Sequence, residues 1–324
     1  MKGPDDKDVP TIFVQVASYR DPDCQWTIKD LFEKAAHPEH IWVGICRQFV
    51  EDEDKACSLE SYPRLDHVRL HEVNALASKG ACWARSIVQK LWKCEDFTLQ
   101  IDSHMRFESG WDEILLSVWY QCNNDKAVVS GYMPGFLPPN AFDRRWIFGM
   151  SASEFDGDKI LRLKGAPAWP TGGGEPSYPV PGAFVGASML FGPASIIRDV
   201  PYDPDLYFFG EEISLGVRLW TNGYDIYHPN RLVMFHNWDR SGRRTHFEDH
   251  ATWGEYHNRA VSRIHKMLGT RKTDDSAEAG DLGKYGLGKV RTLAEFQQYS
   301  GVDFVNLVFD EKASRCDYAE FLSR

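Results

Sequence analysis

The sequence contains no hydrophobic run that approaches the roughly 20 residues needed to span a bilayer. Its polar start, residues 1–8, also lacks the apolar segment of a signal peptide. The seven cysteines are odd in number and scattered, and no two of them form a Cys-x-x-Cys pair. This pattern argues against a disulfide framework or a structural zinc site and favours a reducing compartment. We therefore expect a cytoplasmic protein with no membrane span.

Basic residues are also in short supply: 37 Lys and Arg stand against 47 Asp and Glu, which gives a net charge of −10. Such an excess of negative charge disfavours non-specific nucleic-acid binding, so we expect no nucleic-acid partner. An anionic ligand would need a local basic cluster or a metal ion. The 324 residues are 43% hydrophobic, which is enough for one large domain or two modest ones with a real core.

The first hundred residues alternate short β-rich apolar runs with stretches in which apolar residues recur at helical spacing. Alternation of this kind predicts an α/β fold, a Rossmann-like and mainly parallel sheet flanked by helices. The expected strands are 11–17, 41–46, 68–73 and 97–101, and the expected helices are 26–36 and 80–93.

Residues 133–182 differ from the rest because they are rich in proline and glycine, so we expect an irregular region without sheet or helix. Its tryptophans and phenylalanines argue against a linker and favour a packed surface that holds an acceptor molecule. Flanking segments predict strands 127–132, 182–191 and 232–236 and helices 111–122, 213–222 and 291–299. The expected organisation is a disordered lead-in (1–10), a catalytic domain (11–265) and a C-terminal extension (266–324) packed on the catalytic domain. The extension contains a mobile polar stretch (270–281).

The motif Asp102-x-His104 follows the expected strand 97–101 directly. It offers a carboxylate oxygen and an imidazole nitrogen from one short turn, a pair that suits Mn²⁺ or a similar divalent ion. Ligands of α/β proteins bind just beyond the carboxyl ends of the strands. Most Asp-x-His triplets are ordinary surface turns, so a metal site here needs a further ligand from another strand end.

His236 is a candidate for that further ligand because it ends the expected strand 232–236. Asp102, His104 and His236 would leave positions open on the ion for phosphate oxygens, and the ion could act as Lewis acid when a diphosphate leaves. The alternative is that His236 is a hydrogen-bonded core histidine. Its place at a strand end favours the ligand interpretation.

Glu211 and Glu212 follow the aromatic segment Tyr207–Gly210 at the start of an expected helix. Acidic residues there can serve only to complement the helix dipole, which contributes about 0.5 kcal/mol each. Aromatic faces and carboxylates together also suit a sugar, since rings pack on its C–H face and carboxylates accept hydrogen bonds from its hydroxyls. We favour the sugar-binding interpretation.

Three arginines, Arg240, Arg243 and Arg244, form a local basic cluster shortly after His236. Arginine side chains match phosphate oxygens well. The alternative is a solvated loop with scattered charges. Arg85, near the start of the expected helix 80–93, could also face a nucleotide, because a helix N-terminus is a favourable anion site.

Together these segments resemble a known family. They are similar to the GlcNAc-transferases that modify hydroxyproline on a cytoplasmic ubiquitin-ligase subunit, to their bacterial relatives and, more distantly, to the mucin-type polypeptide GalNAc-transferases. The resemblance spans most of the chain and implies a GT-A glycosyltransferase fold. The segments that carry it are 13–21, 100–107, 208–212, 236–238, 285–288 and 291–293.

The resemblance implies a role for each candidate residue. Glu211 would hold the hydroxyls of the donor sugar, and Glu211 and Asp102 would matter most for catalysis. The metal ligands would be Asp102, His104 and His236, binding Mn²⁺ or Mg²⁺ on UDP. The remaining donor contacts would be Tyr19 and Asp21 near uridine, Arg85 nearby, Gly186 close to the sugar, and Arg240 and Arg243 in a loop over the diphosphate.

The function implied is a metal-dependent retaining transfer of GlcNAc from UDP-GlcNAc to a hydroxyl on hydroxyproline, Ser or Thr of a peptide or protein, or on a glycan. In such enzymes the acceptor attacks from the front face and the leaving phosphate oxygen takes its proton. Three alternatives remain open. They are a non-catalytic sugar-nucleotide or glycan-binding protein on the same fold, a hydrolase of sugar nucleotides, and a transferase that builds a polysaccharide.

Overall fold

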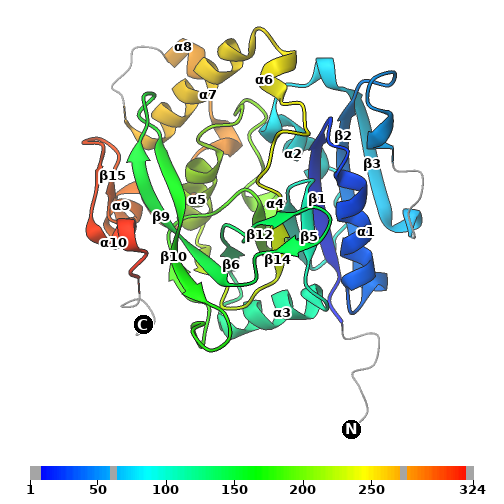
Figure 1. Ribbon diagram of the computed structural model, residues 1–324. Helices are drawn as coiled ribbons and strands as arrows, with labels where there is room; N and C mark the ends of the chain where they lie inside the picture. The colour runs from blue at the N-terminus through cyan, green and yellow to red at the C-terminus, as the bar shows by residue number, and fades with distance from the viewer. Residues whose placement is uncertain (1–8, 59–63, 271–275, 319–324) are drawn as a thin grey trace.

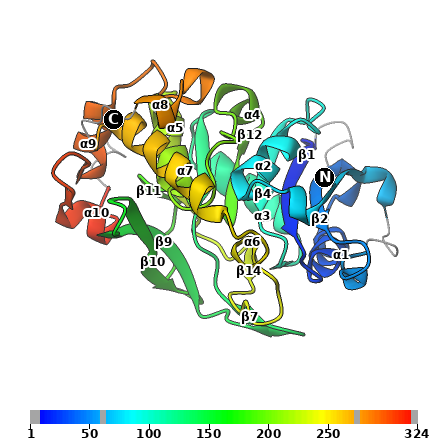
Figure 2. The same ribbon diagram turned by 90° about the horizontal axis from the view of Figure 1, so that it is seen from above.

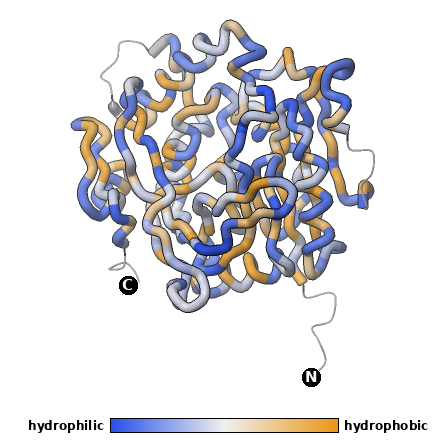
Figure 3. The backbone as a smooth tube through the Cα atoms, viewed as in Figure 1, coloured by the Kyte–Doolittle hydropathy of each residue, from blue (hydrophilic) through white to orange (hydrophobic). Residues whose placement is uncertain are grey.

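The computed structural model describes residues 9–58, 64–270 and 276–318. Most of the expected lead-in, and residues 271–275 of the expected mobile stretch, lie outside these ranges. Hydrophobic and hydrophilic residues are interspersed along the described chain (Figure 3). Within the described residues, no helix combines the length and apolar character that crossing a bilayer requires.

The fold is built on one eight-stranded sheet (Figure 1). Its strands are β1 (Ile12–Tyr19), β2 (Ile41–Phe49), β3 (Val68–Asn74), β4 (Phe97–Ile101), β6 (Ala127–Ser130), β11 (Val180–Gly182), β12 (Met189–Pro193) and β13 (Asp225–His228). They lie in the order β11-β13-β6-β12-β4-β1-β2-β3. β1 to β4 run parallel, as do β6 and β13, whereas β11 and β12 run antiparallel to their neighbours. The prediction of a mainly parallel sheet in an α/β fold is confirmed.

Helices cover both faces of this sheet. The α-helices of the described residues are α1 (Cys24–Lys34), α2 (Ala81–Gln89), α3 (Trp111–Gln121), α4 (Ser195–Asp199), α5 (Glu211–Thr221), α6 (His246–Asp249), α7 (Trp253–Leu268), α8 (Ser276–Ala279), α9 (Leu293–Ser300) and α10 (Glu311–Arg315). Successive side chains of a strand point to opposite faces. Val14 and Val16 of β1 therefore pack with α1 and α3, while Phe13, one residue before Val14, packs with α2 and α4.

The region 133–182 contains a long hairpin, so the prediction that it has no regular strand is wrong. β9 (Trp146–Phe155) and β10 (Leu161–Pro170) pair antiparallel as a separate two-stranded sheet. Each strand has one unpaired edge, where a proline costs no ladder hydrogen bond. Pro167 lies in a register shift and Pro170 ends its strand, so the prolines are compatible with pairing. A shorter pair, β7 (Phe136–Leu137) and β8 (Ala141–Phe142), precedes the hairpin.

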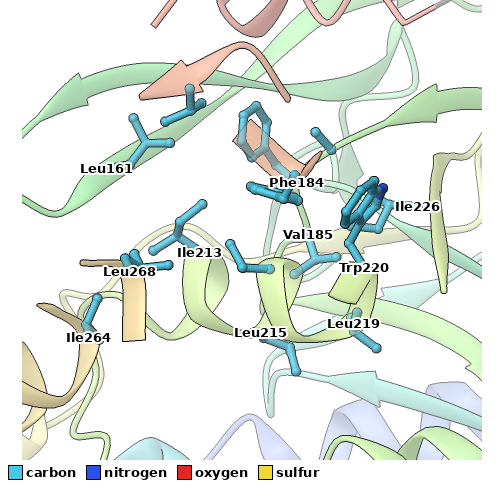
Figure 4. Close-up of a cluster of buried hydrophobic side chains, with 14 of the residues drawn as sticks. Leu161, Phe184, Val185, Ile213, Leu215, Leu219, Trp220, Ile226, Ile264 and Leu268 are labelled. Atoms are coloured by element: carbon cyan, nitrogen blue, oxygen red, sulfur yellow. The ribbon is translucent and has the colours of Figure 1, made fainter. Parts of the chain in front are cut away.

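The expected strand 182–191 is interrupted, because β11 ends at Gly182 and β12 begins at Met189. The intervening Phe184 and Val185 enter a hydrophobic cluster around α5 (Figure 4). The apolar character that predicted a continuous strand therefore reflects packing of a loop into the core. This loop brings Ala187 and Ser188 to the wall of the cavity described below.

The segment after the sheet packs on α5 through α7 and α9. Figure 2 shows α7 beside α5 and α8, and Ile264 and Leu268 of α7 belong to the same buried cluster as α5. A final hairpin, β15 (Val302–Asp303) with β16 (Val308–Phe309), precedes α10. Arg263 of α7 is buried and donates to Asp203 Oδ2 at 2.7 and 2.8 Å and to the Ala279 carbonyl at 2.6 Å.

We expect Arg263→Met to lower the free energy of unfolding by about 3–5 kcal/mol, because it leaves the carboxylate of Asp203 buried without its cation. The neighbouring pair Arg259–Asp205 is 49% and 39% exposed, so Arg259→Met is the matched control and should cost less than about 1 kcal/mol. Urea denaturation of the two variants checks this. Equal stability of both variants would show that the buried pair contributes no more than the exposed one.

Candidate active site

A cavity of about 420 Å³ opens at the carboxyl ends of β1 and β4. This volume is typical of small-molecule sites, and this edge of an open α/β sheet is where ligands usually bind. The wall is formed by residues that follow β1 and β4, by the loop before β12, by the start of α5 and by the segment from His236 to Phe247. Most of the residues singled out from the sequence therefore meet in one place.

A short antiparallel pair of strands brings His236 to His104. β5 (Met105–Phe107) pairs with β14 (Met234–His236), and His236 lies opposite Met105. The backbone N–H of Asn237 also donates to the His104 carbonyl at 3.0 Å. As a result, one ligand atom from each of Asp102, His104 and His236 lies within 4.8 Å of the others.

These three residues fit a divalent ion. Asp102 Oδ2 and His236 Nε2 lie 3.1 Å apart. Two ligands bound at right angles, each about 2.1 Å from one ion, are about 3 Å apart. One carboxylate and two imidazoles suit Mn²⁺ or a similar ion, because both donor types bind borderline metals.

The protonation states also favour metal binding. Burial would raise the pKa of Asp102, but the contact with His236 and the charge of Arg85 outweigh it and hold the pKa well below its usual range. Burial lowers the pKa of His236, although Asp102 opposes that shift. At neutral pH the carboxylate is therefore charged and the imidazole keeps a lone pair for an ion.

Arg85 links the two carboxylates that the sequence marks as most important. Its side chain is buried, and its guanidinium lies 2.9 Å from Asp102 Oδ1 and 3.0 Å from Glu211 Oε1. Glu211 Oε1 also accepts from the Tyr202 hydroxyl at 2.6 Å. Arg85 lines the cavity, but its charge is already balanced by Asp102 and Glu211. A contact between Arg85 and a nucleotide stays a prediction.

Glu212 has a different environment from its neighbour Glu211, and the family resemblance assigned it no role of its own. Its Oε2 accepts from the Tyr132 hydroxyl at 2.7 Å and its Oε1 accepts from the Ala187 N–H at 2.9 Å. Consecutive helical residues point about 100° apart, so one acid of the pair meets Arg85 and the other meets Tyr132. The adjacent acids were visible in the sequence, whereas nothing in it marked Tyr132.

Burial raises the pKa of Glu212 to about 7, against an ordinary value of 4.5. The folded state then binds a proton that the unfolded state has lost, so the free energy of unfolding should fall as pH rises from about 4.5 to 7. Glu212→Gln should remove this loss, so the free energy of unfolding of the variant should exceed that of wild type by more at pH 8 than at pH 5. Urea denaturation at both pH values tests this, and a pH-independent difference would contradict it.

Tyr19 is the last residue of β1, Asp21 follows the strand, and both line the cavity. The Tyr19 hydroxyl donates to Asp249 Oδ2 at 2.9 Å, which ties the end of β1 to α6. Asp21 was expected beside uridine with Tyr19, but only 2% of it is exposed. Its carboxylate lies behind His104 instead, 2.7 Å from Nδ1.

Gly186 lies next to the cavity wall without being part of it, since Ala187 and Ser188 are the lining residues of this loop. A Cβ at position 186 would lie 3.0 Å from both the Gly131 carbonyl oxygen and the Tyr132 ring. The missing side chain therefore allows Tyr132 to pack closely. The expected contact between Gly186 and a sugar stays a prediction.

The arginine-rich segment forms the rim of the cavity. Arg240 and Arg244 are exposed, and Arg244 pairs with Asp249 at 3.1 Å. Arg243 points inward and donates to the carbonyls of Asn237 and Asp239, at 2.9 and 2.6 Å. In a chain of net charge −10, this segment places cations beside the three candidate metal ligands.

The architecture is that of a GT-A glycosyltransferase. The crystal structure of GalNAc-T7 with UDP, GalNAc and Mn²⁺ superimposes with a TM-score of 0.59 over 90% of this chain at 12% identity. The match covers 57% of GalNAc-T7, so this chain corresponds to only part of that protein. The sequence profile of the glycosyltransferase (GlcNAc) family matches residues 11–63 and 60–306, and the chain belongs to this family.

Other comparisons give weaker similarity. Residues 1–349 of TarS from S. aureus superimpose with a TM-score of 0.48 at 11% identity, covering 85% of this chain and 70% of that one. The same TarS fragment in complex with UDP-GlcNAc gives 0.47 at 12% identity, covering 83% and 69%. None of the curated protein sequences compared with this chain matches it.

Proposed function

We propose that this glycosyltransferase moves GlcNAc from UDP-GlcNAc to a hydroxyl acceptor, with retention of the anomeric configuration and with Mn²⁺ or Mg²⁺ as cofactor. The observation that carries the proposal is the convergence of Asp102, His104 and His236 beside a rim of arginines in one cavity. The family profile supports GlcNAc as the sugar. The GalNAc-T7 structure, which contains UDP and Mn²⁺, supports the use of a nucleotide sugar and a metal.

In this proposal Asp102, His104 and His236 hold the ion. When bound, the ion would neutralise the diphosphate and act as Lewis acid as UDP leaves. Arg240 and Arg243 would bind the phosphate oxygens from the rim and stabilise the charge that develops on them. Tyr19 would lie near the uridine, where the end of β1 meets α6.

Glu211 would hold hydroxyls of the donor sugar from the start of α5, with its orientation fixed by Arg85 and Tyr202. The leaving phosphate oxygen would take the proton of the acceptor, and no residue is assigned as catalytic base. Gly186 would approach the sugar through the backbone of its loop.

The acceptor would enter on the side of the β9–β10 hairpin. Leu161, Arg162 and Leu163 of this hairpin line the cavity, and Trp238 faces the same opening with 49% of its surface exposed. Aromatic and aliphatic surface beside a cation suits a peptide or protein segment that carries a hydroxyproline, Ser or Thr hydroxyl, or a glycan. We place the reaction in the cytoplasm because all seven cysteines are free thiols.

The test measures UDP release from a panel of UDP-sugars with Mn²⁺ or with chelator, in the presence of hydroxyproline, Ser or Thr peptides. We expect release from UDP-GlcNAc that requires metal and acceptor, a mass gain of one N-acetylhexosamine, and an α-linkage by NMR. UDP binding without turnover would favour a binding protein, and turnover unaffected by any acceptor would favour a hydrolase. A preference for UDP-GalNAc would show that the donor sugar is GalNAc and not GlcNAc.

A further inference from the structure

Asp21 is held rigidly behind one of the candidate metal ligands. Its Oδ2 accepts from the Ser103 hydroxyl at 2.6 Å and lies 2.7 Å from His104 Nδ1. Its Oδ1 accepts from the Asp23 N–H at 2.9 Å. Both oxygens are therefore engaged within the protein, and the side chain is 97% buried. With 2% of its surface exposed, Asp21 offers little area for contact with a nucleotide base.

We propose that Asp21 is a positioning residue for the metal site, which keeps His104 protonated at Nδ1 and leaves Nε2 as the nitrogen that binds the ion. The inference rests on the proposed function, since it concerns the ion assigned to Asp102, His104 and His236. A metal-bound histidine commonly donates its other ring N–H to a carboxylate, which fixes the tautomer and orients the ring. The geometry of Asp21 matches that arrangement.

The two histidines of the site are held in different ways. His236 Nδ1 is buried and has no hydrogen-bond partner within the described part of the chain. His236 is oriented instead by the pairing of β14 with β5 and by its ring contact with Trp238, with centroids 4.0 Å apart. His104 lies in the turn between β4 and β5, so Asp21 supplies the orientation that strand pairing gives to His236.

The same carboxylate also reaches the arginine rim. Arg243 Nη1 lies 3.7 Å from Asp21 Oδ2, the oxygen that contacts His104. Asp21 is therefore shared between a metal ligand and an arginine that the proposed function places on the diphosphate. Asp21 also lines the cavity itself.

The test measures Mn²⁺ affinity by the loss of the free-ion EPR signal, in the presence of UDP, for wild type, Asp21→Ala and Asp21→Asn. Removing such a carboxylate typically weakens metal binding about 10–100-fold, which is the result expected for Asp21→Ala. Asp21→Asn should lose less Mn²⁺ affinity, since its amide oxygen can still accept from the Nδ1–H of His104. The matched control is Asp54→Asn, because Asp54 contacts Arg20 on the same side of β1 and not His104.

The second readout is the tautomer of His104 in the metal-free protein, read from its ring ¹⁵N shifts and assigned with His104→Gln. We expect Nδ1–H in wild type and a gain of the Nε2–H form in Asp21→Ala, a change that general destabilisation would not produce. Unchanged Mn²⁺ affinity and an unchanged tautomer in both Asp21 variants would overturn this inference but leave the proposed function standing. Absence of Mn²⁺ binding in wild type would overturn the proposed function itself.

Discussion

Asp102→Asn is expected to reduce kcat/KM for UDP-GlcNAc about a thousandfold in saturating Mn²⁺, the scale seen when preorganised electrostatic stabilisation is removed. The carboxylate of Asp102 contacts His236 and Arg85 and is the only acidic residue of the candidate metal set. Asparagine keeps the shape of the side chain but removes the charge. Steady-state rates of UDP release with wild type and variant measure the effect.

The control for this experiment is Asp125→Asn, an exposed acid at the amino end of β6, on the opposite edge of the sheet. It changes the net charge of the chain by the same amount and should leave kcat/KM within about twofold of wild type, since exposed charges at this distance are screened by salt. If Asp102→Asn kept a rate within tenfold of wild type, Asp102 could not be the acid that holds the ion.

Arg85→Met is expected to lower the free energy of unfolding by about 3–5 kcal/mol and to reduce activity about a hundredfold or more. The substitution leaves the carboxylates of Asp102 and Glu211 near each other without the cation between them. Both losses have one cause, because the same side chain neutralises the site and orients its two acids. Urea denaturation and steady-state kinetics measure them separately.

Arg85→Lys separates charge from geometry. Lysine keeps the positive charge, but its single ammonium cannot reproduce the fork that contacts Asp102 and Glu211 together. We expect an intermediate loss of both stability and activity. Arg198→Met, which removes an exposed pair on α4, is the control for loss of an arginine. A fully active and stable Arg85→Met would show that Asp102 and Glu211 need no bridge.

The sequence predicts the sheet well, because β1, β2 and β4 are short segments rich in apolar residues and are followed by polar ones. Since parallel strands end at the same edge, the position of Asp102 after β4 also follows from the pattern. The hairpin β9–β10 was missed because proline content was given more weight than strand alternation. α7 was also missed, although Ala260, Ile264 and Leu268 have the four-residue spacing of an apolar helix face.

The roles of the site residues were harder to predict than the place where those residues meet. The family resemblance placed Asp21 near uridine, yet the direction of its side chain is set by Ser103 and His104, which lie 82 and 83 residues further along the chain. The pair of Glu212 with Tyr132 likewise depends on how the loop after β6 packs on α5. Such side-chain directions are determined by tertiary packing and leave no periodic signal in the sequence.

The central claim is that one divalent ion binds between Asp102, His104 and His236. Crystals grown with UDP and Mn²⁺ test it most directly, through anomalous scattering at the manganese edge. We expect one strong peak at about 2.1–2.4 Å from a carboxylate oxygen of Asp102 and from the Nε2 atoms of both histidines, distances that lie between those typical of Mg²⁺ and of Ca²⁺. A peak elsewhere, or UDP bound in the cavity without a metal peak, would contradict the assignment.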